Sequence, residues 1–167
     1  MNELPPIDLP PGIRSSFAEN VNGLRMHYLE TGPDDGSRPL LLLLHGFPEL
    51  AYSWRKVMVP LAERGYHVVA PDQRGFGRTT GWDDAYDQDL RPFNLLNLVR
   101  DAVALIRKLG YDKVKGVFGH DFGSPVAAYA SLIRPDLFRS VALMSAPFAG
   151  PPVFTDNNAS DGPSIFD

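Results

Sequence analysis

The chain has 167 residues, which suits a single domain with a sizeable hydrophobic core. Its net charge of -4 gives no basic footprint, so we expect no nucleic-acid partner. It contains no cysteine, which excludes disulfides, thiolate catalysis and cysteine-rich zinc sites.

The first half of the chain predicts a hairpin, a helix and two buried strands. The proline-rich residues 1–14 are expected to form a flexible lead-in; their acidic start is unlike a signal peptide. The longest aliphatic run, Leu40 to Leu44, is too short to cross a bilayer, so we expect a cytoplasmic protein. The expected elements are a β-hairpin over residues 15–20 and 24–30 around the Asn22-Gly23 turn, a strand over 40–45, a helix over 53–65 and a strand over 66–72.

The second half of the chain repeats the alternation of helices and strands. Residues 73–92 are rich in glycine and aspartate and predict a loop. The elements expected after it are a helix over 93–110, a strand over 114–119, a helix over 124–135 and a strand over 140–147. Buried strands that alternate with helices predict an α/β fold in which helices cover both faces of a mostly parallel sheet.

Three short segments follow predicted strands of this sheet. They are HGFP at residues 45–48, DQRGFGRT at 72–79 and GHDFG at 119–123. Because sites in such sheets form outside the carboxyl ends of the strands, we expect these loops to converge.

GHDFG matches the strand-to-helix turn that presents a nucleophile, with aspartate at the nucleophile position. Gly119 and Gly123 would let the strand and the helix approach closely. The backbone N–H groups of Phe47 and Phe122 would form an oxyanion hole beside Asp121. The alternative is that Asp121 is only a helix N-cap, a position that aspartate favours.

The sequence resembles the α/β-hydrolase fold and, within it, the epoxide hydrolases. The resemblance covers roughly residues 15–150 and rests on four segments, HGFPELAYSWR (45–55), GYHVVAPDQRGFGRT (65–79), NLVRDAVALIRKLG (97–110) and GHDFGSPVAA (119–128). It implies a three-layer core with an N-terminal antiparallel hairpin and no cofactor or metal. Asp121 would be the nucleophile, Phe47 and Phe122 the oxyanion-hole residues, and Phe47, Pro48 and Phe122 the lining of a site for a small apolar epoxide.

The family's reaction has a second half that this chain lacks the residues for. An ester formed on the aspartate is hydrolysed by water that a histidine, paired with an acid, activates; two tyrosines of a cap assist the first half. None of His27, His45, His67 and His120 is expected to be that base. We therefore expect a C-terminally truncated core over residues 15–150, with 151–167 as the start of a missing cap connection.

Two other functions stay open at this point. A haloalkane-type dehalogenase shares the aspartate nucleophile, but Phe47 and Phe122 supply no donor for a halide. A non-catalytic remnant or binding module would fit the missing base. Truncation would also leave an apolar sheet edge at Ser140 to Pro147, where self-association is expected.

Nearby polar residues are assigned structural roles. Asp72, Arg74 and Arg78 are expected to brace the second loop, and Ser124 lies outside the nucleophile position.

Overall fold

The structure is a computed structural model that describes residues 5–146. Within that range, six strands form one sheet in the order β1-β2-β4-β3-β5-β6. The elements in chain order are β1 (Arg14–Val21), β2 (Leu24–Thr31), β3 (Leu40–Leu44), the 3-10 helix η1 (Ala51–Trp54), α1 (Arg55–Glu63), β4 (His67–Pro71), the 3-10 helix η2 (Arg91–Phe93), α2 (Leu95–Lys108), β5 (Val114–His120), α3 (Gly123–Ile133) and β6 (Val141–Met144).

The sheet is mixed in the way that the sequence predicts. β1 and β2 form the antiparallel hairpin, and β2 also pairs antiparallel with β4. The next pairs, β4 with β3, β3 with β5 and β5 with β6, are all parallel. The expected α/β architecture with an N-terminal hairpin is therefore confirmed.

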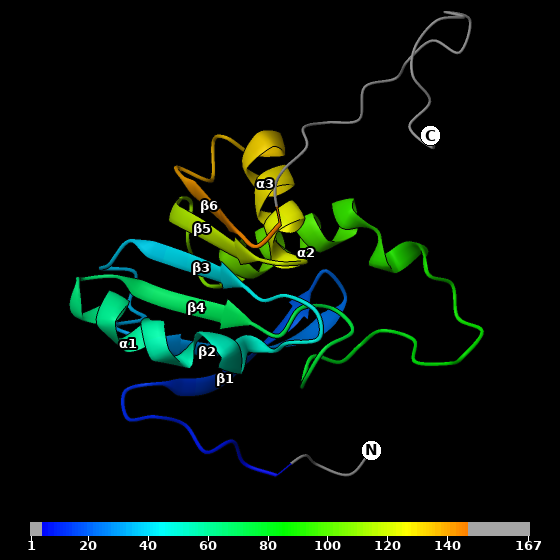
Figure 1. Ribbon diagram of the computed structural model, residues 1–167, viewed down its shortest axis with the longest axis horizontal. Coiled ribbons are helices and arrows are strands. Elements are labelled where there is room, and N and C mark those ends of the chain that lie inside the picture. The colour runs from blue at the N-terminus through cyan, green and yellow to red at the C-terminus, as the bar shows by residue number, and fades with distance from the viewer. Residues whose placement is uncertain (1–4, 147–167) are drawn as a thin grey trace, which may run out of the picture.

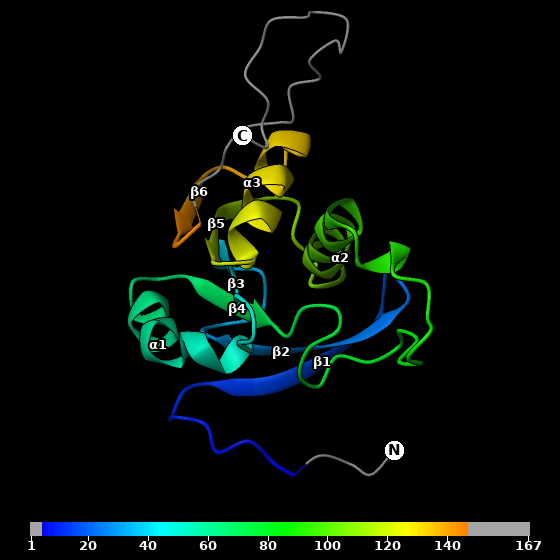
Figure 2. The same ribbon diagram turned by 45° about the vertical axis from the view of Figure 1, so that its right-hand side comes forward.

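Helices cover both faces of the sheet, as Figures 1 and 2 show. α1 lies on one face, and α2 and α3 lie side by side on the other. All five leucines of β3 are buried: Leu40, Leu42 and Leu44 pack on the side of α2 and α3, and Leu41 and Leu43 on the side of α1. Burial of each such side chain stabilises the fold by about 1.5–3 kcal/mol. A five-residue apolar run is thus the central strand of a three-layer core.

The helix ends follow local chemistry. The Asn94 side chain accepts a hydrogen bond from the Asn97 N–H at 2.9 Å and caps α2, and Gly110 takes a positive φ of 81° just after the helix. The helix predicted over residues 53–65 is divided into η1 and α1, and Pro60 lies inside α1.

The ends of the described region bear on three expectations. Ile7 and Leu9 pack against the α1 side of the core, and Ile13 is buried, so part of the proposed lead-in contributes to that core. In the part of the chain that the structure describes, β6 is the last strand of the sheet, and Val141 on it is 43% exposed. Pro147 and the proposed cap connection, 151–167, lie outside the described residues.

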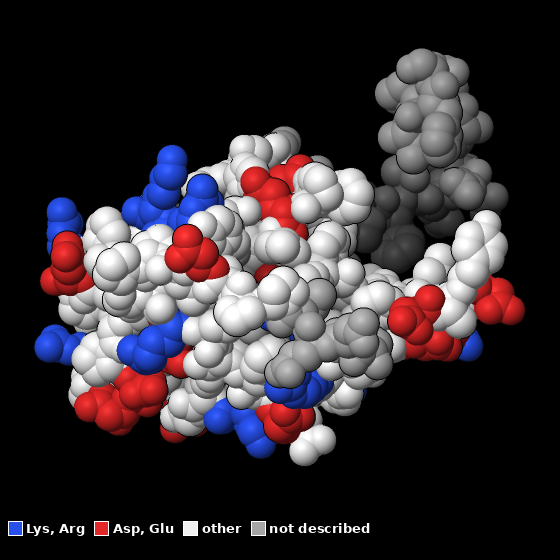
Figure 3. Space-filling view, turned by 90° about the horizontal axis from the view of Figure 1, so that it is seen from below, with Lys and Arg blue, Asp and Glu red and all other residues white. Residues whose placement is uncertain are grey.

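The loop between β4 and α2 projects from the body of the molecule in Figure 1. This loop carries four exposed aspartates, Asp83, Asp84, Asp87 and Asp89. Figure 3 shows the red of Asp and Glu at that end of the molecule. Among the described residues, no helix has the length and apolar character needed to cross a membrane.

A buried polar network joins β1, β2 and β4 to the residues after α2. His67 Nε2 lies 2.9 Å from a carboxylate oxygen of Glu30, and His67 Nδ1 lies 2.9 Å from the Tyr111 hydroxyl. The Ser16 hydroxyl donates to the other Glu30 oxygen at 2.6 Å. Burial alone would raise the pKa of Glu30, but the hydrogen bonds from His67 and Ser16 and the charge of Arg14 lower it overall.

This network predicts acid lability. A carboxyl whose pKa is lower in the folded state contributes stability that is present above its ordinary pKa near 4.5 and lost as the pH falls through the folded value. The free energy of unfolding should therefore fall as the pH drops below about 4.5. Urea denaturation across that pH should show a shallower pH dependence in Glu30→Gln than in Glu63→Gln, which changes an exposed carboxylate on α1. Equal pH dependence in the two variants would contradict the assignment.

Candidate active site

The three predicted loops meet at one edge of the sheet. β4, β3 and β5 are neighbours in that order, so the segments after their carboxyl ends lie next to one another. The Gln73 N–H donates to His45 Nε2 at 3.0 Å, and the Gln73 side-chain amide donates to the His45 carbonyl at 2.7 Å. Burial lowers the pKa of His45, so the neutral ring accepts at Nε2 and donates from Nδ1 to the Gly46 carbonyl. His45 therefore joins the first two loops, as a loop-shaping residue should.

Asp121 lies in a strained turn between β5 and α3. Its φ is 48°, in the left-handed region that L-residues rarely adopt. Its N–H donates to the Met144 carbonyl at 2.8 Å, and its carbonyl accepts from the Ser124 N–H at 2.9 Å. Backbone bonds on both sides thus hold the turn, and the side chain of Asp121 is partly exposed.

The carboxylate of Asp121 does not act as a helix cap. α3 begins at Gly123, and its N-cap residue, Phe122, makes no side-chain cap bond. One Asp121 oxygen instead accepts from the N–H of Phe47, 74 residues earlier in the chain, at 2.9 Å. The N-cap alternative is therefore wrong.

Backbone amides stabilise the ionised form of Asp121. The hydrogen bond from the N–H of Phe47 is the largest cause that lowers the pKa of this carboxyl below its ordinary value, followed by the hydrogen bond from the N–H of Phe122. The charge of the nearby His120 lowers the pKa by a smaller amount. The two amides that the sequence analysis singled out thus meet at one carboxylate.

Close backbone approach explains two glycines of the site. A Cβ on Gly123 would lie 2.3 Å from the Leu44 carbonyl oxygen, and a Cβ on Gly46 would lie 2.6 Å from the Cβ of Asp121. Neither position leaves room for a side chain. The small residues therefore allow α3 and the HGFP loop to close around Asp121.

A methyl group at position 123 should destabilise the fold. We expect Gly123→Ala to lower the free energy of unfolding by about 1–3 kcal/mol, because backbone atoms of β3 must move to relieve the overlap. Urea denaturation monitored by circular dichroism would measure it. Leu132→Ala, an exposed position on the same helix, is the control and should change stability little. Equal stability of the two variants would show that α3 can shift freely.

Each histidine already has a partner other than Asp121. His27 pairs with Asp72 at 2.7 Å and with the Ser15 hydroxyl, and His120 pairs with Glu49 at 3.0 Å. His45 and His67 have the partners given above. Glu49, which the sequence analysis did not select, lies just after HGFP, and its contact joins that loop to the turn at Asp121.

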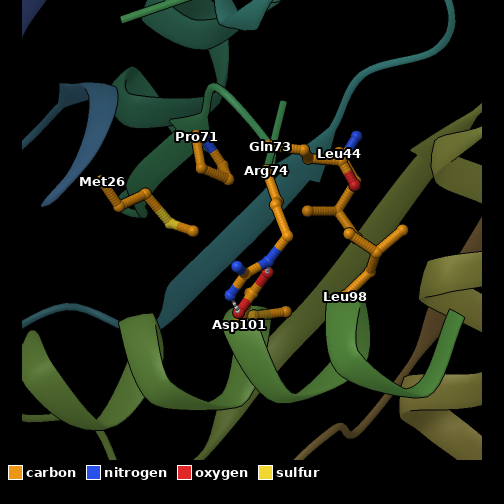
Figure 4. A pocket seen from close by; sticks show the side chains of 8 residues that line it. Met26, Leu44, Pro71, Gln73, Arg74, Leu98 and Asp101 are labelled. Carbon is orange, nitrogen blue, oxygen red and sulfur yellow. Dashed lines mark hydrogen bonds and ion pairs between the residues drawn. The ribbon is translucent and has the colours of Figure 1, made fainter. Parts of the chain in front are cut away.

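The polar residues of the second loop have the structural roles predicted for them. Asp72 accepts from the N–H groups of Ala51 and Arg78, and the Arg78 guanidinium donates to the Pro5 carbonyl. Figure 4 shows Arg74 reaching from this loop to Asp101 on α2. Arg74 Nε and Nη2 each donate to an Asp101 oxygen at 2.8 Å, and the two side chains are 6% and 5% exposed.

The Ser124 hydroxyl lies 2.8 Å from the Gly119 carbonyl and 2.9 Å from the Met144 carbonyl. These contacts connect the turn at Asp121 to β6, which is a structural role for Ser124.

An apolar pocket opens beside Asp121. It has a volume of about 150 Å³ and is lined by Phe47, Arg74, Phe76, Phe93, Leu98 and Phe122. We call it the phenylalanine pocket. Phe47 and Phe122 both line it while their backbone amides bind the carboxylate. Pro48, predicted to line the substrate site with them, follows Phe47 and is exposed, but it is not among the residues that line this pocket.

Comparison with known proteins decides the family. A family model described as the alpha/beta hydrolase fold matches residues 39–166. The chain belongs to the α/β-hydrolase fold family. This α/β hydrolase is 40% identical over 131 residues to epoxide hydrolase B of Mycobacterium tuberculosis, and 40% identical over 131 residues to epoxide hydrolase 3 of Siraitia grosvenorii. These matches cover 78% and 77% of the chain.

Solved structures agree with the sequence relatives. The α/β hydrolase superposes on epoxide hydrolase I of potato, Solanum tuberosum, with a TM-score of 0.74 and 43% identity over 86% of the chain. It matches 43% of that structure, and 35% and 38% of the lengths of the two sequence relatives. The chain thus spans about two fifths of these proteins.

Several contacts around the site could hardly be predicted from the sequence. A weak signal existed for Asp101, because it is a charged residue on a helix whose neighbours Leu98, Ala102 and Leu105 are buried. Phe93 reads as part of the helix that follows it, and nothing local indicates that its ring reaches the neighbourhood of Asp121.

Proposed function

We propose that the chain supplies the nucleophilic half of an epoxide hydrolase, which hydrolyses epoxides to vicinal diols through an ester on Asp121. The observation that carries the proposal is the strained turn at Asp121, whose carboxylate accepts the N–H of Phe47. In this proposal the turn is a nucleophile elbow, and the amides of Phe47 and Phe122 form the oxyanion hole. The epoxide hydrolases similar to this chain support the substrate class.

The geometry suggests how the first step would proceed. The N–H of Phe47 holds one carboxylate oxygen, Oδ1, and in this proposal the other oxygen attacks an epoxide carbon. A new C–O bond forms, the C–O bond of the epoxide breaks, and the ring oxygen leaves as an alkoxide that takes a proton from water. The amides hold Asp121 ionised, and the phenylalanine rings keep the surroundings apolar. Phenylalanine rings offer no N–H to a halide, which favours an epoxide over a haloalkane.

Mass spectrometry can test this proposal. The 167-residue chain, incubated with styrene oxide and digested, should carry one equivalent of adduct on the peptide with Asp121. Because we expect none of the four histidines to serve as the base, and general base catalysis typically contributes about 10²–10⁴-fold, the ester should persist without sustained diol formation. Adducts spread over many exposed carboxylates would overturn the proposal.

We also propose that this chain self-associates through the outer edge of β6. Val141 is 43% exposed there, and an edge strand with free backbone groups pairs readily with another chain. Sedimentation velocity at several concentrations should show dimers or larger species. A lysine on the edge should weaken pairing, so Val141→Lys is expected to shift the chain toward monomer, while Val57→Lys, at a 44% exposed position on α1, should not. Monomer at all concentrations would contradict the proposal.

We also propose a cytoplasmic location for this chain. It rests on the acidic, proline-rich start of the sequence, which is unlike a signal peptide, and on the shortness of its longest aliphatic run. Fractionation of cells that express the tagged chain would test it, with recovery in the membrane pellet as the contrary result.

A further inference from the structure

A serine, a histidine and an aspartate form a hydrogen-bonded row apart from the site at Asp121. Ser15 Oγ lies 2.9 Å from His27 Nε2, and His27 Nδ1 lies 2.7 Å from Asp72 Oδ2. The three residues come from β1, from β2 and from the position just after β4, so the sheet brings them together. A hydroxyl on a base that a third group orients is the arrangement that activates a nucleophilic serine in hydrolases of unrelated folds.

Strand pairing sets the positions of the serine and the histidine. In the register of β1 with β2, Ser15 lies opposite Leu29 and Phe17 lies opposite His27. Because side chains alternate between the two faces of a sheet, Ser15 and His27 share the face that packs toward α1. Ser15 is exposed, whereas His27 and Asp72 are only 1% and 3% exposed. A solute can therefore reach the hydroxyl, while the base and the acid behind it are shielded from water.

The surroundings of Asp72 determine which nitrogen of His27 carries the proton. Burial alone would raise the pKa of Asp72, but hydrogen bonds from His27 and from the N–H groups of Arg78 and Ala51 lower it overall. An ionised carboxylate can only accept, so His27 Nδ1 donates to it. In the neutral ring Nε2 is then the acceptor, and the Ser15 hydroxyl donates to it. The serine proton thus points at the atom that could remove it.

A cavity borders the same histidine. It has a volume of about 390 Å³, and His27 and Asp72 form part of its wall. Leu29, Leu50 and Tyr52 give the cavity apolar and aromatic surface. A molecule with an aromatic group can therefore bind against the His27 ring, on the face of the sheet where the Ser15 hydroxyl lies.

We propose that Ser15, His27 and Asp72 form a second nucleophilic site, at which Ser15 takes the acyl group of an aryl ester. The Ser15 oxygen forms a bond to the ester carbonyl carbon, and His27 Nε2 takes the serine proton. The C–O bond to the aryl group then breaks, the phenolate leaves, and His27 gives its proton to water. Asp72 is a positioning residue that orients the ring and balances its charge. A phenolate is a much weaker base than an alkoxide, so an aryl ester needs the least help to lose its leaving group. This inference is independent of the reaction proposed for Asp121.

Acetylation of the 167-residue chain by p-nitrophenyl acetate tests the second site. After short exposure and an acid quench, peptide mass spectrometry compares Ser15 with Ser53, an exposed serine of η1. General base catalysis typically contributes about 10²–10⁴-fold, so Ser15 should be acetylated at least about 10²-fold faster than Ser53. Release of p-nitrophenolate should fall in Ser15→Ala and not in Ser53→Ala. Both variants change exposed side chains, so the fold should persist in each.

Two further measurements test His27 as the base. His27→Gln should lower the acetylation of Ser15 to the rate at Ser53, provided that circular dichroism shows a folded chain. If that variant does not fold, the unaltered chain gives a second readout, because proton transfer to His27 should make acetylation of Ser15 slower in D2O than in H2O. A purely structural pair of His27 and Asp72 predicts equal rates at the two serines. Equal rates, no acetylation with unchanged release in Ser15→Ala, or a Ser15 rate unaffected by both His27→Gln and D2O would each overturn the proposal.

Discussion

An Asp121→Asn variant should lose epoxide labelling by more than about 10³-fold, since removal of the nucleophile of a characterised hydrolase costs on the order of 10⁶ in kcat. The asparagine oxygen can still accept the N–H of Phe47, so the turn should stay folded, but the neutral amide has no charge with which to attack carbon. Peptide mass spectrometry after equal exposure to styrene oxide measures the loss. Asp121→Ala guards against deamidation of the asparagine, which would restore the aspartate.

Asp136 provides a matched control for this experiment. It is an exposed carboxylate whose hydrogen bonds and ion pair with Arg134 lower its pKa to about 2, so it is fully ionised at neutral pH. Asp136→Asn should leave labelling of the chain unchanged. If Asp121→Asn and Asp136→Asn reduce labelling equally, the reaction follows exposure and charge alone, and the amides at Asp121 give no advantage.

The ion pair of Arg74 and Asp101 should have the largest effect on stability. Asp101→Leu leaves a buried guanidinium without its carboxylate, and loss of one partner from a buried pair costs about 3–5 kcal/mol. The expected result is a fall of that size in the free energy of unfolding, measured by urea denaturation. The pair connects the loop after β4 to α2, and both side chains are almost fully buried, so solvent cannot replace the lost partner.

A double variant distinguishes the pair from simple packing. Arg74→Met with Asp101→Leu removes both charges and keeps apolar volume, so most of the lost stability should return. The difference between the double variant and the sum of the single variants gives the coupling energy. Additive losses would show that the two residues act separately. Arg91→Met, in an exposed pair with Asp89, is the control and should change stability by less than about 1 kcal/mol.

The local pattern of the chain was enough to predict the layers and the convergence of the three loops. A run of five consecutive leucines favours a strand covered on both sides, and the alternation with helical segments leaves few parallel topologies. The spacing of Gly119, Asp121 and Gly123 likewise predicts a tight strand-to-helix turn. The structure explains the two glycines, because a Cβ on either would overlap backbone atoms. Such signals depend on neighbours within a few residues, and a single sequence contains them.

The tertiary structure alone decided how distant residues pair. Sequence left Asp121 open between a nucleophile and a helix N-cap, and the amide that its carboxylate contacts lies 74 residues away, at a position that depends on the pairing of β3 with β5. The same holds for Arg74 with Asp101, for Glu49 with His120, and for the ring of Phe93. Each contact forms because hydrophobic packing first brings the elements together and the buried polar groups must then find partners. The sequence by itself therefore determined which elements form and that an aspartate stands at the end of β5, whereas packing decided which groups hold that aspartate ionised and which rings surround it.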